Sequence, residues 1–159
     1  MACGGGATAA AALAQSPADG HTLMVTDGPL LAITPLVSRQ MSYDPAKDFT
    51  PVSLVGVAPL FLAVNANVKA NTLEELVALA KQRPGALNYG SAGIGSIHHL
   101  TAEAMKEGLG IFVTHIPYRG AGPALNDLMS GQVHMTWNNL TSNLTMIQQG
   151  RLRALAVAS

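Results

Sequence analysis

The segment NYGSAGIGSIHHL, residues 88–100, decides the fold class of this chain. Its first three residues predict a short strand, and a glycine-rich turn follows at once. A helix is expected to begin at Ser96, where apolar residues start to recur at helical spacing. A strand that passes through a tight turn into a helix is the repeating unit of α/β proteins.

The same alternation extends along the chain after Pro59, a residue that a central strand tolerates poorly. Thr72 and Glu75 predict a capping box at the start of a helix. The full set expected in this part comprises strands at 60–64, 88–90, 113–116, 133–137 and 152–158, and helices from Thr72, from Ser96, near Pro123 and over 140–149. Strictly alternating strands and helices predict an α/β sheet with helices on its faces.

Two further patterns carry predictions about burial. Before Pro59 we expect a helix at 7–15, a buried strand at 22–26 and an apolar, strand-like run at 52–57. In the strand at 133–137, apolar and polar residues alternate, which predicts one buried face. Trp137 lies on that face and is expected to be partly buried and structural.

The composition excludes several classes of protein. Only 11% of the 159 residues are charged, and nine basic residues balance nine acidic ones, so nucleic acid is not an expected partner. Glycine and proline interrupt the apolar runs before they reach the about 20 residues of a membrane span. The amino terminus lacks the pattern of a signal peptide, and the single Cys3 allows no intrachain disulfide.

The glycine-rich turn is the first candidate site. Its glycines let the backbone approach a ligand, and the first amides of the helix after Ser96 have no partner inside the helix. With the hydroxyls of Ser91 and Ser96, these amides would form an anion site. A plain connector with Ser96 as an ordinary N-cap accounts for the spacing equally well. The glycines match neither a dinucleotide fingerprint nor a P-loop.

Two more strand-to-helix turns are expected at the same rim of the sheet, after residues 116 and 137. Arg119 in the first of them would either meet an anion or remain a solvated loop residue. The sequence contains no nucleophile elbow and no pair of carboxylates placed for acid–base chemistry. His98 and His99 with Glu103 lack the spacing of a metal site and indicate an ordinary helix face.

The run at 89–96, followed by His99 and Leu100, strongly resembles the Bug family, the extracytoplasmic solute receptors of tripartite tricarboxylate transporters. The resemblance continues in the segments at 17–23, 43–49, 51–54, 115–120, 127–133 and 150–157. These segments occur in the order of the family and cover nearly the whole chain.

The resemblance implies an α/β fold of the type II periplasmic-binding kind, with two lobes built on mixed sheets and the ligand between them. It assigns residues 1–58 to a partial first lobe, 59–153 to the ligand-binding second lobe and 154–159 to a strand that returns toward the first lobe. It also implies that the chain is incomplete, because family members begin with an export signal, a strand and a Pro/Gly-rich ligand loop.

Residue by residue, the resemblance gives ligand-binding positions. The carboxylate loop matches Ser91, Ala92, Gly93, Gly95 and Ser96. Cleft positions match Tyr118 and Asn138 in the second lobe and Thr26, Asp27 and Gly28 in the first. Two departures stand out: an acid at Asp27 would repel an anionic ligand unless it turns away, and Asn138 stands where members often have the Asp that would bind an amino group.

The function implied is capture of a small carboxylate (a di- or tricarboxylate or a related organic acid) in the periplasm for the membrane components of a tripartite transporter. No cofactor, catalytic residue or metal is expected. A ligand-sensing regulatory domain of the same fold is the alternative, followed by a hydrolase or nucleotide-using enzyme. The chain itself is expected to bind such ligands weakly and to self-associate through uncovered segments at 22–26 and 52–57.

Overall fold

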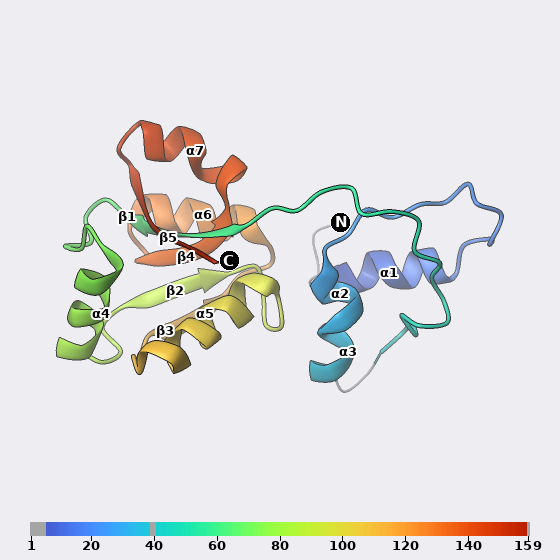
Figure 1. The fold of residues 1–159 in the computed structure, drawn as a ribbon, viewed down its shortest axis with the longest axis horizontal. Helices are drawn as coiled ribbons and strands as arrows, with labels where there is room; N and C mark the ends of the chain where they lie inside the picture. The colour runs from blue at the N-terminus through green and yellow to red at the C-terminus, as the bar shows by residue number, and fades with distance from the viewer. Residues whose placement is uncertain (1–5, 39–40, 159) are drawn as a thin grey trace.

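The computed structural model describes residues 6–38 and 41–158, so Cys3 lies outside the described part. Figure 1 shows a sheet with its helices, connected by a long extended segment to a separate group of helices near the N-terminus. The helices are α1 (Ala7–Ala14), α2 (Gly28–Ala32), α3 (Thr34–Val37), α4 (Leu73–Gln82), α5 (Ile97–Leu109), α6 (Ala121–Ser130) and α7 (Leu140–Gln148). The strands are β1 (Leu60–Asn65), β2 (Asn88–Ser91), β3 (Thr114–Pro117), β4 (Met135–Asn139) and β5 (Leu152–Ala158).

The five strands form one mixed sheet in the order β3-β2-β4-β1-β5. β2 runs parallel to β3 and β4, whereas β1 is antiparallel to both β4 and β5. The alternation of strands and helices predicted after Pro59 is confirmed element by element. Because β2 and β3 are parallel neighbours, the turns that follow them lie at the same edge of the sheet.

Local sequence explains where helix α4 begins. Thr72 is its N-cap, and the Thr72 hydroxyl accepts a hydrogen bond from the Glu75 amide at 3.2 Å. The Glu75 carboxylate accepts from the amide of Asn71 at 2.6 Å, one residue before the position that a capping box predicts. Both first-turn acids, Glu74 and Glu75, also complement the positive end of the helix dipole.

Helices cover both faces of the sheet. One core cluster packs α4 and α5 against Leu62, Val64 and Trp137, and a second packs α6 and α7 around Ala63. Trp137 is only 6% exposed, so its structural role is confirmed and its burial is deeper than expected. The prediction of one buried face for β4 is wrong, because Thr136 on its other face is also buried. β4 lies between β2 and β1, and helices cover both of its faces.

The N-terminal segment has a small core of its own. Ala10, Leu30 and Tyr43 are its buried residues, and the Tyr43 hydroxyl donates to the Leu30 carbonyl at 2.9 Å. The expected helix at 7–15 is confirmed as α1, whereas α2 and α3 have no counterpart in the sequence predictions. This cluster contains far fewer buried side chains than the sheet, so the segment has less apolar burial to stabilise it.

The strand predicted at 22–26 is wrong. Residues 21–27 have no regular structure, and Leu23 and Val25 are 73% and 84% exposed. The apolar run at 52–57 is likewise irregular and exposed. A strand needs a neighbour to complete its hydrogen bonds, and the described residues offer none to either segment. The burial predicted for 22–26 is therefore wrong, whereas the expectation that both segments are left uncovered in this chain is confirmed. Their self-association stays a prediction.

Within the described residues, every helix is too short or too polar to cross a bilayer.

Candidate ligand-binding cleft

The turn between β2 and α5 has a backbone that glycine makes possible. Gly93 and Gly95 have φ values of 129° and 79°, in the region that L side chains rarely adopt. A Cβ atom at Gly93 would lie 3.4 Å from the Tyr118 carbonyl, and one at Gly90 would lie 3.2 Å from the Tyr118 ring. The turn after β2 is therefore packed directly against the turn after β3.

Both serine hydroxyls of this turn are engaged in shaping it. Ser91 Oγ donates to the Gly93 carbonyl and accepts from the Gly93 amide, each at 3.2 Å. Ser96 Oγ donates to the same carbonyl at 2.7 Å and accepts from the His99 amide at 3.3 Å. Ser96 is thus an N-cap, as the plain interpretation predicted.

Capping does not consume all donors of the turn. In the described part of the chain, no hydrogen bond occupies the amides of Ile94, Ile97 and His98. Two of these belong to the first turn of α5, a helix of 13 residues whose dipole adds partial positive charge there. The cap and the anion site are therefore compatible: the hydroxyls fix the turn, and the free amides remain available.

A stack of aromatic rings packs against the turn and hydrogen-bonds to it. The His115 ring stacks on His99 at 4.2 Å and on Tyr89 at 4.7 Å between centroids. His115 Nε2 lies 2.7 Å from Ser91 Oγ, and the Gly95 amide donates to His99 Nδ1 at 3.2 Å. Burial lowers the pKa of His115, and a charge on His99 would lower it further. His115 is therefore neutral at pH 7.

Glu103 completes this network. Its Oε1 atom accepts from the Tyr89 hydroxyl at 2.6 Å and from Lys106 Nζ at 2.7 Å. Burial acts to raise the pKa of the Glu103 carboxyl, but the hydrogen bonds from Lys106 and Tyr89 outweigh it and hold the pKa below its usual value. Burial and this same hydrogen bond raise the pKa of Tyr89. The support is thus a fixed, ionised Glu103 and a protonated Tyr89.

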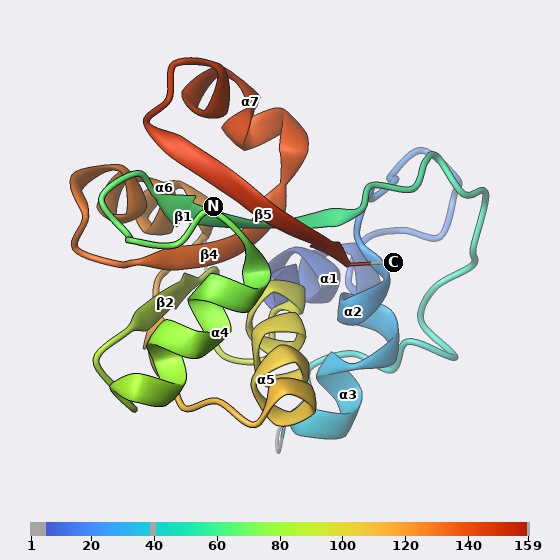
Figure 2. The ribbon, with the colours of Figure 1, turned by 60° about the vertical axis from the view of Figure 1, so that its left-hand side comes forward.

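The turn forms one wall of a cavity of about 520 Å³. The opposite wall comes from the N-terminal segment, which Figure 2 shows beside α5. The N-terminal lining residues are Ala7, Asp27, Pro29, Leu30, Thr34 and Ser38, and those of the sheet domain are the run 92–100 with Tyr118 and Arg119. This volume is in the range of small-molecule sites.

Six of the ten residues predicted for the site line this cavity: Ala92, Gly93, Gly95, Ser96, Tyr118 and Asp27. Ser91 lies beneath the turn and is 1% exposed, so it shapes the wall rather than forming it. Asn138 is buried in β4, where its side-chain oxygen accepts from the Asn139 amide at 2.9 Å. Thr26 and Gly28 flank Asp27 but do not line the cavity.

Tyr118 faces the cavity as a neutral phenol. Its hydroxyl donates to Asp127 Oδ2 at 2.7 Å. Burial, together with this hydrogen bond, raises the pKa of Tyr118 to about 12. The acidic partner fixes the hydroxyl hydrogen toward Asp127, so the ring edge and face are what Tyr118 offers to a ligand.

Sequence reasoning undervalued two lining residues. Arg119 lines the cavity. Its position therefore agrees with the first of its two expected roles, contact with an anion. His98, interpreted as an ordinary helix face, also lines it, and its Nδ1 atom is buried without a hydrogen-bond partner in the described residues. Burial lowers the pKa of His98, although the nearby Asp27 acts to raise it. The only signal available for either residue was its place within the two turns.

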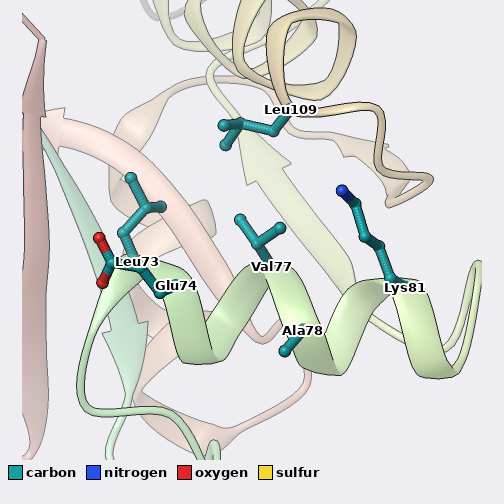
Figure 3. Close-up of a pocket in the computed structure, with 6 residues that line it drawn as sticks. All are labelled: Leu73, Glu74, Val77, Ala78, Lys81 and Leu109. Atoms are coloured by element: carbon teal, nitrogen blue, oxygen red, sulfur yellow. The ribbon is translucent and has the colours of Figure 1, made fainter.

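A second depression, of about 360 Å³, lies between α4 and the end of α5 (Figure 3). Leu73, Val77 and Leu109 give it an apolar floor, and Glu74 and Lys81 stand at its edges. It has no set of converging donors. Elsewhere, the described part of the chain shows no group of three or more His, Cys, Asp or Glu side chains arranged to hold a metal ion.

The glycine turn, its free amides and the cavity beneath the N-terminal helices are the features expected of a solute receptor, and comparison with known proteins decides the family. The model of the tripartite tricarboxylate transporter family receptor, TctC, matches residues 1–159. The chain belongs to this family. The expected resemblance to Bug receptors is confirmed, and the family is one of receptors rather than enzymes.

Among its relatives, protein BugT of Bordetella pertussis is 37% identical over 98% of this chain and 48% of BugT. Among solved structures, R. palustris Rpa4515 with adipate is 39% identical with a TM-score of 0.93, over 97% of this chain and 52% of that one. MatC from Rhodopseudomonas palustris with bound malate is 31% identical with a TM-score of 0.83, over 98% of this chain and 53% of that one. The chain therefore spans about half the length of the relatives it matches, and the expected mixed α/β fold is confirmed.

Proposed function

We propose that the full-length protein is an extracytoplasmic solute-binding receptor that captures a small carboxylate between two lobes. The observation that carries the proposal is the turn from Ser91 to Ser96 together with the start of α5, where the unoccupied amides of Ile94, Ile97 and His98 belong to residues that line a cavity shared with the N-terminal segment. Membership of the TctC receptor family supports the same conclusion.

The chemistry of the wall suits a carboxylate. Backbone amides at a helix N-terminus bind anions without the desolvation cost of burying a lysine. A hydrogen bond to an ionised carboxylate contributes roughly 1.5–3 kcal/mol, so two of the amides of Ile94, Ile97 and His98 would account for a micromolar site together with cavity burial. Arg119 adds a guanidinium at the same cavity.

The ligands of relatives support the class of ligand. Rpa4515 was solved with adipate and MatC with malate, both dicarboxylates. We propose that this protein takes a small organic acid of related size in the cavity lined by Ala92, Gly93, Gly95, Ser96 and Tyr118, with the free amides of Ile94, Ile97 and His98 as hydrogen-bond donors. Ser91 supports these contacts through its hydrogen bonds with Gly93, and Asn138, which does not line the cavity, is left out of them.

The proposal includes the organisation of the chain. Residues 1–58 belong to the first lobe, 59–153 form the second lobe and 154–159 lead back toward the first. The receptor works in the periplasm and delivers its ligand to the membrane components of a tripartite transporter. One solved relative, 28% identical over 98% of this chain, is the periplasmic binding protein BugD, which supports this location.

Isothermal titration calorimetry of the full-length protein tests the proposal. Adipate, malate and citrate are the probes, and adipamide is the neutral control for adipate. Binding of at least one acid in the micromolar range, with no binding of adipamide, is expected. An Arg119→Gln variant should bind that acid about tenfold more weakly, a loss of about 1.4 kcal/mol.

Arg83→Gln is the matched control, because Arg83 is exposed and lies outside the cavity. It should leave the affinity unchanged. If adipamide binds as tightly as adipate, or if a broad panel of organic acids gives no heat, the proposed function is wrong.

A further inference from the structure

The cavity contains one acid and one strong base, and they come from different walls. Asp27 belongs to the N-terminal segment, and Arg119 belongs to the turn between β3 and α6. Within the described residues, neither side chain takes part in an ion pair or a side-chain hydrogen bond. A ligand that carries one negative and one positive group could pair with both of these unpaired charges.

The Asp27 carboxylate does not cap the helix that follows it. Asp27 is the N-cap residue of α2, yet its side chain makes no capping hydrogen bond. The Thr26 hydroxyl donates to the Asp27 backbone carbonyl at 3.4 Å, a bond that does not involve the carboxylate. The side chain is exposed at the cavity rim. Its contacts with the described residues therefore give no structural reason for an acid at this position.

Among the described residues, no neighbour neutralises this carboxylate. His98 is the titratable side chain whose charge couples to Asp27, and burial lowers the pKa of His98. Its imidazole is therefore neutral at pH 7 and supplies no counter-charge. A second carboxylate of a bound diacid would meet an uncompensated negative charge on this side of the cavity.

We infer that the ligand is a dipolar amino-carboxylate whose carboxylate contacts the turn at residues 91–96 and Arg119 and whose ammonium group faces Asp27. The inference rests on the proposed function, because it takes the carboxylate end as given and adds the chemistry of the other end. Recognition of the amino group does not need an acid at Asn138, since Asn138 is buried in β4 and does not line the cavity.

Matched ligands test the inference by calorimetry on the full-length protein. Three pairs share a carboxylate and differ at the far end: succinate and 4-aminobutyrate, glutarate and 5-aminopentanoate, adipate and 6-aminohexanoate. In the wild type, the amino acid of the best-fitting pair should bind more tightly than its diacid. In Asp27→Asn, we expect its affinity to fall about tenfold and that of the diacid to rise about tenfold, so selectivity changes about a hundredfold.

Asp19→Asn is the control, because Asp19 is exposed in the same segment and does not line the cavity. Its Oδ1 accepts from the His21 amide, a bond that the amide oxygen of asparagine keeps. This variant should leave selectivity unchanged.

The outcomes separate the two proposals. Tighter binding of the diacids in the wild type, with a selectivity ratio that Asp27→Asn does not change, overturns the amino-carboxylate inference and leaves carboxylate capture standing. If none of the six ligands binds, nor any organic acid of the broader panel, the proposal of carboxylate capture is wrong, and the amino-carboxylate inference is then wrong as well. A change of selectivity in Asp19→Asn as large as in Asp27→Asn would assign the effect to general charge and also overturn the inference.

Discussion

Replacing Gly95 by valine tests whether the turn after β2 is the carboxylate site. Gly95 has φ 79°, where a residue with a Cβ atom costs roughly 1–2 kcal/mol and a β-branched one more. Relief of this strain moves the backbone between Ile94 and Ile97, the segment that holds the free amides. Losing two hydrogen bonds to an ionised carboxylate, at roughly 1.5–3 kcal/mol each, corresponds to about two to four orders of magnitude in Kd.

The assay is calorimetry of wild-type and Gly95→Val full-length protein with the best carboxylate of the panel, beside urea unfolding of both. Gly20→Val is the matched control, because Gly20 has φ 81° and lies in an exposed loop with open space around it. Both variants should lose similar stability, and only Gly95→Val should lose affinity. Unchanged affinity in a folded Gly95→Val protein would refute the assignment of this turn to the ligand.

Three further predictions concern stability and assembly. Trp137 fluorescence should be blue-shifted and resist acrylamide quenching, and an emission maximum typical of a water-exposed indole would contradict its burial at 6% exposure. Because the pKa of His115 is lowered in the folded protein, the unfolded chain takes up a proton at His115 below about pH 6.5 more readily than the folded protein does. The free energy of unfolding should therefore fall as pH drops from 7.5 to 5.5, by at most about 1.4 kcal/mol per pH unit for this group, and His115→Gln should flatten the profile. The 159-residue chain should self-associate in sedimentation velocity, and charged substitution of the exposed Val25 and Val55 should reduce this; an unchanged distribution would exclude these segments as the contact.

The sheet domain could be predicted because its signals are local. Thr72 and Ser96 both cap helices through their hydroxyls, as their spacing indicates, and glycine ends α5 and α6 in the left-handed conformation. Strand pairing is not local. The alternation at 133–137 predicted one buried face, and only the position of β4 between β2 and β1 shows that Thr136 is buried as well.

The N-terminal segment shows where sequence reasoning fails. The run at 22–26 has the composition of a buried strand, but strand formation depends on a partner, and the described residues supply none. Helices α2 and α3 were missed because each is shorter than two turns and contains a proline, which usually indicates a turn.

The site itself could be predicted in part. The glycine turn was identifiable from its residues, whereas the placement of Asp27 and Arg119 at one cavity depends on how the two parts of the chain are arranged. The support from His99 and His115 depends on contacts between α5 and β3, residues 16 apart in the sequence, which spacing does not reveal. Family resemblance supplied Asn138 as a cleft residue, and its burial in β4 could not be predicted from that match; its contact with a ligand stays a prediction.

The two walls of the cavity differ in how many contacts fix them in place, and we infer that they therefore play different roles in binding. The turn at 91–96 is fixed by serine hydrogen bonds and by a partly buried ring stack, so its donors are preorganised and no ordering of the turn opposes binding. Among the described residues, the N-terminal wall rests on three buried side chains, and it connects to β1 through the exposed, irregular residues 50–59. Changes in the turn should therefore weaken all carboxylates alike, whereas changes at Asp27 should alter which carboxylate is preferred.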